Sequence, residues 1–197
     1  MNELEFNEAD HTYKFKGKLV DNVTRVLSPL VSYRMIDPVK LETARKKGIA
    51  VHKMVELWCK DDLDEDNLPE WMIPALVQWK EFVKFTKFKV LQSECRVYHP
   101  QFKYAGTLDL FGTMSGSEYT HIDIKRSFGA GGVIGYQIAA YGEAHKTDNG
   151  YKHYKRFALR LREDGAFKLL EYKDSMDFMH FLTCLNMYRL QEMHSGK

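Results

Sequence analysis

Two β-rich runs that flank a short turn constrain the fold of this chain more than any other feature. The runs are Tyr104–Thr113 and Glu118–Arg126, and Ser115-Gly116-Ser117 lies between them. A short connection with a central glycine is typical of a β-hairpin. The sequence therefore predicts that the two runs pair as antiparallel strands about Gly116.

The predicted hairpin brings two carboxylates together. Pairing about Gly116 places Asp109 opposite Asp123 and Thr107 opposite Lys125, and the two-residue period of a strand puts these four side chains on one face. The two carboxylates would lie roughly 5 Å apart, where like charges destabilise a sheet. The other face would hold Leu108, Ile122 and Ile124.

A facing carboxylate pair implies a bound cation, a shared proton or a different register. Hard cations such as Mg²⁺ or Mn²⁺ take oxygen ligands, and the ammonium of Lys125 could orient a water or stabilise charge on a phosphate. The alternative is an edge hairpin whose acidic and basic groups form a solvated cross-strand network. The spacing alone leaves both interpretations open.

Other segments accompany the hairpin. Gly48–His52 lies upstream on a run that predicts a helix, Glu94 precedes the hairpin, and Gln137–Tyr141 follows it on another predicted helix. The order is a histidine, a glutamate, Gly-x-x-Asp, Asp-x-Lys and Gln-x-x-x-Tyr. This order resembles that of the PD-(D/E)XK nucleases of the RecB and AddB type.

The resemblance covers roughly residues 10 to 175 and is closest to small stand-alone exonucleases, those of phages and the mitochondrial genome maintenance exonuclease. Val23–Leu27 also resembles their N-terminal signature, although relatives often carry Pro-Ser where Asp21-Asn22 stands here. The resemblance implies an α/β fold with a PD-(D/E)XK restriction-endonuclease-like core, α-β-β-β-α-β, whose central mixed sheet is flanked by helices. It also implies a metal-dependent DNA exonuclease that hydrolyses phosphodiester bonds in single-stranded DNA or at DNA ends, in phage or bacterial recombination, repair or replication.

Carried over residue by residue, the resemblance makes Asp109, Asp123 and Lys125 catalytic. It makes His52, Asp109, Asp123 and the backbone carbonyl of Ile124 ligands of two Mg²⁺ or Mn²⁺ ions, and an imidazole nitrogen suits Mn²⁺ better. Unaided by the family, His52 is better interpreted as a partly buried helix histidine or a phosphate contact.

Four residues are predicted to support this site. The family places a carboxylate near the metal at Glu94, which could instead pair with Arg96 on an exposed face. Gln137 and Tyr141 share one helix face and in the family brace the site or touch DNA, whereas an isolated Tyr usually anchors its helix on the sheet. Glu56, one helical turn after the histidine, could face either the hairpin or solvent.

The net charge is only +2, so any DNA-binding surface needs segregated charge. The basic residues on the predicted histidine helix are the better candidates for DNA binding: Lys40, Arg45, Lys46, Lys47 and Lys53. A second basic run, 152–162, alternates with Phe157, Leu159 and Leu161, which favours a strand whose basic residues lie outside the core.

Length and composition set the outer bounds. With 197 residues and 44% hydrophobic content we expect a single nuclease domain over residues 1–197, in which an N-terminal hairpin and helical region (about 1–88) packs on a catalytic core (about 89–175) and a C-terminal helix follows. Some relatives carry an iron-sulfur cluster on four cysteines, and the scattered Cys59, Cys95 and Cys184 do not predict one. The absence of a long apolar run or leader predicts a cytoplasmic protein without a membrane segment.

The predicted partner is DNA, as single strands or duplex ends, with a single-strand-binding protein or a recombinase as a further partner. Two alternatives stay open: a structure-specific endonuclease acting on flaps or branches, and a catalytically silent DNA-binding accessory module on the same fold. Intact Asp109, Asp123 and Lys125 argue against the silent module, because it has no need to hold two repelling carboxylates together.

The remaining elements follow from hydrophobic periodicity and turn residues. Before the hairpin we expect strands at His11–Lys16 and Lys18–Asp21, helices at Val39–Lys60, loosened at Gly48, and Ile73–Phe88, and a strand at Lys89–Tyr98. After the helix that carries Gln137 we expect strands at His153–Arg162 and Ala166–Tyr172 and a helix from Ser175 to about Met193.

Overall fold

The computed structural model describes residues 3–31, 36–116, 118–126, 131–162 and 165–195. Its main elements are, in chain order, β1 (Leu4–Asn7), β2 (Thr12–Phe15), β3 (Lys18–Asn22), α1 (Val23–Leu27), α2 (Pro38–Cys59), α3 (Ile73–Thr86), β4 (Lys89–His99), β5 (Tyr104–Met114), β6 (Glu118–Lys125), α4 (Gly132–Asn149), β7 (Lys155–Arg160), β8 (Lys168–Glu171) and α5 (Asp177–His194). Short 3-10 helices span Ser28–Leu30 and Glu70–Met72. The predicted order of helix, three strands, helix and strand is present as α3, β4, β5, β6, α4 and β7.

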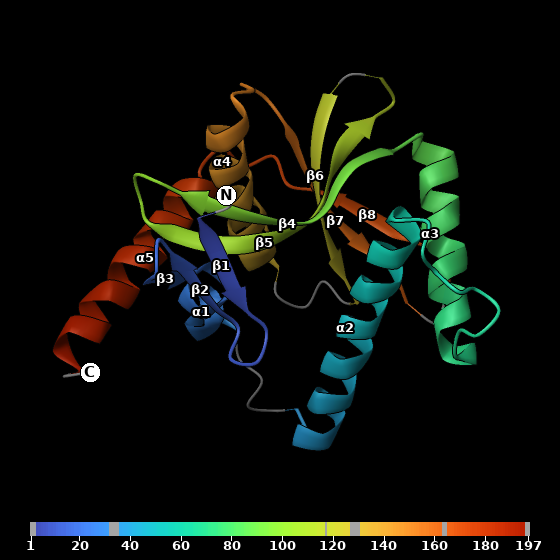
Figure 1. Cartoon of the computed structure of the whole chain (residues 1–197), viewed down its shortest axis with the longest axis horizontal. Helices are drawn as coiled ribbons and strands as arrows, with labels where there is room; N and C mark the ends of the chain where they lie inside the picture. The colour runs from blue at the N-terminus through green and yellow to red at the C-terminus, as the bar shows by residue number, and fades with distance from the viewer. Residues whose placement is uncertain (1–2, 32–35, 117, 127–130, 163–164, 196–197) are drawn as a thin grey trace.

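The strands form one mixed sheet with helices on both of its faces (Figure 1), which confirms the predicted fold class. Strand β5 is its centre. It pairs with β4 along one edge, while its other edge pairs with β3 at Tyr104 and Ala105 and with β6 from Leu110 to Met114. Strand β5 therefore changes partner along its length, and the sheet forks between the two pairings.

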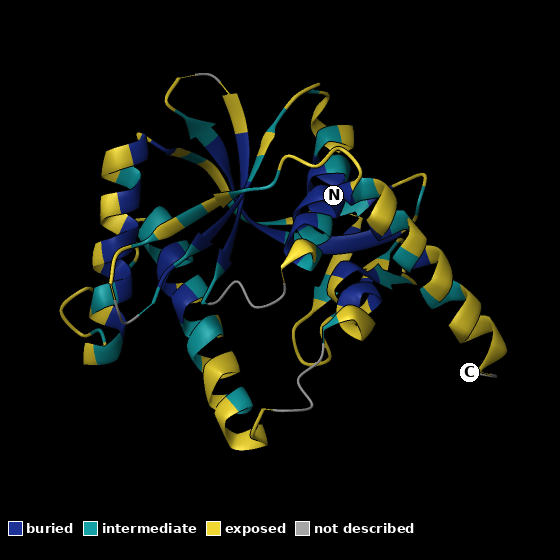
Figure 2. Cartoon of the chain, turned by 180° about the vertical axis from the view of Figure 1, so that it is seen from behind, coloured by how far each residue is buried: buried dark blue, intermediate teal, exposed yellow. Residues whose placement is uncertain are grey.

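Two large apolar clusters hold the helices on the sheet. One joins α2 and α3 to β6 and β7 and is centred on Trp79 and Phe82, which are fully buried. The other joins α1, α4 and α5 to β4 and β5 around Tyr104 and Phe181. Figure 2 shows the buried sheet between these layers and the mostly exposed first half of α2, which projects from the body.

Helix α1, which the strand and helix patterns did not predict, begins at the residues that depart from the family pattern. The side chain of Asn22 caps it by accepting hydrogen bonds from the backbone N–H groups of Thr24 and Arg25. Asp21 forms an ion pair with Arg189 of α5, at 2.6 Å. Asp21-Asn22 thus starts the helix and ties it to the C-terminal helix.

Two other expectations have clear outcomes. Helix α2 runs unbroken through Gly48, so the predicted loosening there is wrong; its cap at Asp37 and the buried face with Val51 and Met54 hold it together. Strand β7 lies parallel to β6 with buried Phe157, Ala158 and Leu159, which confirms the strand interpretation of the second basic run.

Within the described part of the chain, no helix is long and apolar enough to cross a membrane.

Candidate active site

The predicted hairpin register is confirmed over the paired part of β5 and β6. Leu110 lies opposite Ile122 and Met114 opposite Glu118, as pairing about Gly116 requires. Extended by one residue, this register brings Asp109 to Asp123 at the fork of the sheet. There the Oδ2 atom of Asp109 accepts a hydrogen bond of 2.6 Å from the backbone N–H of Ile124.

The register beyond the fork differs from the prediction. Thr107 does not face Lys125, because the pairing of β5 with β6 ends at Leu110 and Ile122 and β3 pairs with the same edge of β5 at Tyr104 and Ala105. On their other edges, Thr107 pairs with Arg96 of β4 and Lys125 with Arg160 of β7. Leu108 does not share a cluster with Ile122 and Ile124 either. Leu108 packs under α1, α4 and α5 in the cluster around Tyr104 and Phe181, whereas Leu110 belongs to the cluster of Ile122 and Ile124.

Helix α2 delivers His52 to the fork. Its Nε2 atom lies 2.9 Å from the backbone carbonyl oxygen of Ile124, to which it donates as Nε2–H. Its Nδ1 atom then faces two carboxylates, 3.4 Å from Asp109 Oδ1 and 4.0 Å from Glu94 Oε1. This is the orientation of a metal-ligating histidine, whose second nitrogen is held by a carbonyl.

The carbonyl of Ile124, predicted as a metal ligand, thus accepts a hydrogen bond from His52. A carbonyl oxygen has two lone pairs, so one remains for a cation. The backbone of Ile124 also donates its N–H to Asp109. Ile124 therefore fixes two of the candidate ligands, and its own ligation remains a prediction.

Glu94 completes a cluster of ligand atoms. Its strand register places it opposite Asp109, between the pairs Ser93–Leu110 and Cys95–Leu108. His52, Glu94 and Asp109 each offer a ligand atom, and these three atoms lie within 4.8 Å of one another. Among the described residues, no other three metal-ligating side chains lie so close together. An imidazole nitrogen and two carboxylates fit Mn²⁺ or Mg²⁺.

The backbone of Glu94 is strained in a way that serves this cluster. Its φ is 50°, in the left-handed region that a residue with a side chain rarely adopts. Such a conformation costs on the order of 1–3 kcal/mol and persists where the surrounding structure imposes it. The left-handed conformation occurs in β4 at the residue whose carboxylate faces His52 and Asp109.

The charges of the cluster shift one another's protonation. Burial lowers the pKa of His52, but the Asp109 carboxylate outweighs this and raises it to about 9. Burial raises the pKa of Glu94 to about 7, with the charge of Asp109 acting in the same direction. Burial also acts to raise the pKa of Asp109, yet the His52 charge is among the effects that together lower it. Without a metal, the imidazolium takes the place of a cation between the carboxylates.

Asp123 and Lys125 lie next to this cluster on β6. Asp123 is only 1% exposed, and burial raises its pKa to about 6 although the adjacent ammonium opposes this. The Nζ atom of Lys125 lies 2.6 Å from Asp123 Oδ2 and donates to Gln137 Oε1 at 3.2 Å. The ammonium is thus held between a strand carboxylate and the amide of α4.

Gln137 and Tyr141 of α4, which were predicted to support the site, contact each other next to Lys125. Gln137 Nε2 donates to the Tyr141 hydroxyl at 3.0 Å, and Tyr141 is buried against β5 at Gly106. A Cβ atom on Gly106 would lie 2.3 Å from Tyr141 Cε1. The glycine of Gly-x-x-Asp therefore makes room for the tyrosine that positions Gln137 and, through it, Lys125.

We expect Gly106→Ala to lower the free energy of unfolding by about 2 kcal/mol, because the buried tyrosine must move. Cleavage should fall by about tenfold, since Gln137 then no longer positions Lys125. Denaturant unfolding and a cleavage assay would measure the two effects. Gly48→Ala is the control for stability: it has open space in α2, so it should stabilise the helix by up to about 1 kcal/mol. Wild-type stability and rate in Gly106→Ala would contradict this role.

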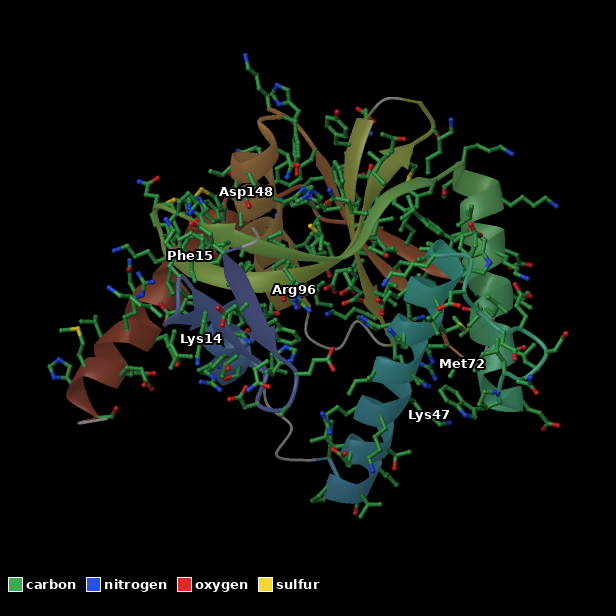
Figure 3. All side chains as sticks on the ribbon, in the orientation of Figure 1. Lys14, Phe15, Lys47, Met72, Arg96 and Asp148 are labelled. Atoms are coloured by element: carbon green, nitrogen blue, oxygen red, sulfur yellow. The ribbon has the colours of Figure 1, made fainter. Side chains whose placement is uncertain are left out.

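Glu56 and the basic residues of α2 lie outside the metal cluster. Glu56 forms ion pairs with Lys53 and Lys60, and these ammonium groups lower its pKa against the effect of burial. Arg45 and Lys46 both contact Glu42, whereas the Lys47 ammonium lies 4.9 Å over the Trp71 ring (Figure 3). The predicted DNA-binding cluster on α2 is therefore partly neutralised by its own helix.

A cavity of about 780 Å³ lies beside the site, between α2, α4 and the segment after α1. His52, Ile124, Lys125 and Gln137 line one side of it, and Lys40, Arg45 and Arg126 contribute positive charge. Apolar side chains such as Leu27 and Ile134 line the rest. This combination suits a nucleic-acid strand, whose phosphates meet cations and whose bases meet apolar surface.

Tyr13 of β2 is a site neighbour that sequence reasoning missed. It is fully buried, and its hydroxyl lies 2.8 Å from Thr107 Oγ1, two residues before Asp109. The contact joins positions 94 residues apart in the chain. No local pattern indicates such a contact, so only the alternating apolar residues of β2 could have suggested that Tyr13 points inward.

No protein-family model matches the chain, and no curated protein matches it. Among solved structures, an alkaline exonuclease from Laribacter hongkongensis is similar, with a TM-score of 0.41 and 12% sequence identity over 89% of this chain and 88% of the exonuclease chain. The structure of the same exonuclease in complex with dAMP gives a TM-score of 0.40 and 13% identity over 90% and 89% of the two chains. Because no family matches and the identity to these structures is only 12–13%, the chemistry proposed for the site rests on its own side chains.

Proposed function

We propose that this chain is a PD-(D/E)XK nuclease, a metal-dependent DNA exonuclease that hydrolyses phosphodiester bonds. One observation carries the proposal. A histidine and two carboxylates place ligand atoms within 4.8 Å of one another, and Lys125 is held by Asp123 and Gln137 beside them. A buried pair of like charges with an adjacent ammonium is costly unless it serves chemistry.

The residues have distinct roles in this proposal. His52, Glu94, Asp109 and Asp123 would hold Mg²⁺ or Mn²⁺, and such ions supply an activated water and neutralise charge on the phosphate. Lys125 stabilises the charge that develops on the phosphate oxygens, because Asp123 and Gln137 keep its ammonium pointing into the site. Gln137 and Tyr141 position this lysine from α4.

The cavity beside His52 supports an unpaired strand as substrate. It is lined by both basic and apolar side chains and extends to His52 and Lys125. A duplex keeps its bases stacked inside, whereas a single strand can place them against apolar walls. A strand end that enters this cavity would present its phosphates to His52 and Lys125.

The test is to compare linear with covalently closed circular single-stranded DNA in the presence of Mn²⁺ or Mg²⁺, with a chelator as control. We expect the linear strand to be degraded and the circle to survive. Cleavage of the circle would replace the exonuclease by a structure-specific or single-strand endonuclease. If neither substrate nor a flapped or branched duplex is cut, the nuclease proposal is wrong and a DNA-binding module remains.

A further inference from the structure

Strands β1 and β2 form a hairpin that lies directly beside the metal cluster, yet the proposed chemistry assigns this hairpin no role. The hydrogen bond between the Tyr13 and Thr107 hydroxyl groups anchors it on β5, two residues before Asp109. Phe6 of β1 packs on Tyr13 with ring centroids 4.7 Å apart and meets His11 edge-on at 5.0 Å. The hairpin therefore presents a fixed aromatic surface next to the site.

The side chain of Arg96 in β4 contacts this aromatic surface at Phe6. Its guanidinium carbon lies 5.4 Å from the centre of the Phe6 ring, the distance of a cation–π contact. Arg96 is exposed, and among the ion pairs of the described residues none involves it. The alternative raised from the sequence, a pair between Glu94 and Arg96, is thus not formed in the described part of the chain; Glu94 faces His52 instead.

The strand register sets the distance from Arg96 to the metal cluster. Arg96 pairs with Thr107 and is the second residue after Glu94 in β4, and the charges of Arg96 and Glu94 both act on the Tyr13 hydroxyl, so the two side chains lie on the same side of the sheet. Two residues along a strand span about 7 Å. This is close to the separation of neighbouring phosphates in an extended nucleic-acid strand. A phosphate at the metal centre would therefore have its neighbour within reach of the Arg96 guanidinium.

The charges around the site favour Arg96 for this contact. On α2, Arg45 is paired with Glu42 and Lys53 with Glu56, so their attraction for a phosphate is reduced. Among the described residues no carboxylate forms an ion pair with Arg96, and its guanidinium lies over the Phe6 ring. A guanidinium held in this way binds a phosphate through two parallel N–H groups.

We propose that Arg96, positioned by Phe6, binds the phosphate next to the scissile phosphate of the substrate strand. The inference rests on the proposed nuclease function and adds a substrate subsite on the hairpin side of the metal centre. Arg96 is a binding residue for the strand, and Phe6 is a positioning residue that acts through it.

The test combines protein variants with a substrate from which one charge is removed. Arg96→Ala, Arg96→Lys and Phe6→Leu would be compared with wild type on single-stranded oligonucleotides in which one phosphate at a time, on either side of the cleaved bond, is an uncharged methylphosphonate. Lys14→Ala is the matched control, because Lys14 is an exposed cation on the same hairpin, between Tyr13 and Phe15, which face the apolar cluster. In the view of Figure 3, Arg96 is labelled on the side of the hairpin that faces α2, and Lys14 is labelled on the opposite side of the hairpin.

We expect Arg96→Ala to raise KM about tenfold with kcat nearly unchanged, and to reduce the salt dependence of binding by about one phosphate contact. Arg96→Lys should recover part of the loss, Phe6→Leu should lose part of the affinity, and Lys14→Ala should behave as wild type. One methylphosphonate next to the scissile bond should weaken wild type about tenfold and leave Arg96→Ala unaffected at that position.

Two results would overturn the inference: an Arg96→Ala variant that binds and cuts like Lys14→Ala, or one that remains as sensitive as wild type to every methylphosphonate. Binding measured in the Asp123→Asn background separates this outcome from failure of the proposed function. A protein that binds strands through Arg96 but never cuts them refutes the nuclease proposal alone. A protein that cuts strands without using Arg96 refutes the subsite alone.

Discussion

Asp123→Asn and Lys125→Ala are each expected to reduce cleavage by about a thousandfold or more while DNA binding stays within a few-fold of wild type. Asparagine keeps the shape of the buried Asp123 side chain but removes the charge that faces the metal cluster and the Lys125 ammonium. Alanine at 125 removes the one ammonium held by both Asp123 and Gln137. Both changes act on groups needed when charge develops on the phosphate and not when the strand binds.

Single-turnover cleavage of an end-labelled oligonucleotide with Mn²⁺ measures the first effect, and fluorescence anisotropy measures binding. Lys53→Ala is the matched control, because Lys53 is a lysine near the site whose ammonium pairs with Glu56 on the surface of α2. Its cleavage rate should stay within a few-fold of wild type. Undiminished cleavage by a folded Asp123→Asn or Lys125→Ala protein would refute the assigned roles.

The second large effect concerns stability: Asp123→Asn is expected to stabilise the metal-free protein at neutral pH. Burial raises the pKa of Asp123 to about 6, so the folded state binds this proton more tightly than the unfolded chain does. The stability of the metal-free wild type therefore falls as the pH rises from about 4 to about 6, and it stays lower above that range. Asparagine resembles the protonated carboxyl and removes this loss, which is on the order of 2 kcal/mol.

Thermal unfolding with a chelator at pH 5 and pH 7.5 measures this effect. The variant should gain roughly 5 °C over wild type at pH 7.5 and much less at pH 5. Added Mn²⁺ should raise the melting temperature of wild type more than that of the variant, because only wild type offers both strand carboxylates. Asp62→Asn, a change of an exposed acidic residue, is the control and should leave both properties as in wild type. Equal melting temperatures of wild type and Asp123→Asn in the chelator at both pH values would contradict the argument.

The sequence predicted the parts of this fold that local patterns determine. The turn at Gly116 fixed the register of β5 and β6, and alternation identified β7 as a buried strand. The fork was beyond local patterns, because it depends on β3 pairing with Tyr104 and Ala105 from the far end of the chain. This distant pairing uses the edge of β5 that would otherwise continue along β6, which is why Thr107 does not face Lys125.

The candidate site divides in the same way. The order of the motifs predicted that His52, Asp109 and Lys125 belong to one site. In the structure, His52 Nδ1 and Asp109 Oδ1 lie 3.4 Å apart. The positive φ of Glu94 is a tertiary effect that no propensity scale contains. The hydrogen bond from His52 to the Ile124 carbonyl likewise depends on how α2 docks, which sequence spacing does not specify.

The hydrogen bond that closes the fork has a consequence for ion selectivity. Asp109 Oδ2 accepts the hydrogen bond from the backbone N–H of Ile124, which turns Oδ1 towards His52 and the metal cluster. This orientation favours ligation through the single oxygen Oδ1. Calcium prefers six to eight oxygens and often takes both from one carboxylate, whereas Mg²⁺ and Mn²⁺ suit octahedral sites with single-oxygen ligands. The backbone of the sheet thus favours the smaller ions by limiting how a carboxylate can bind.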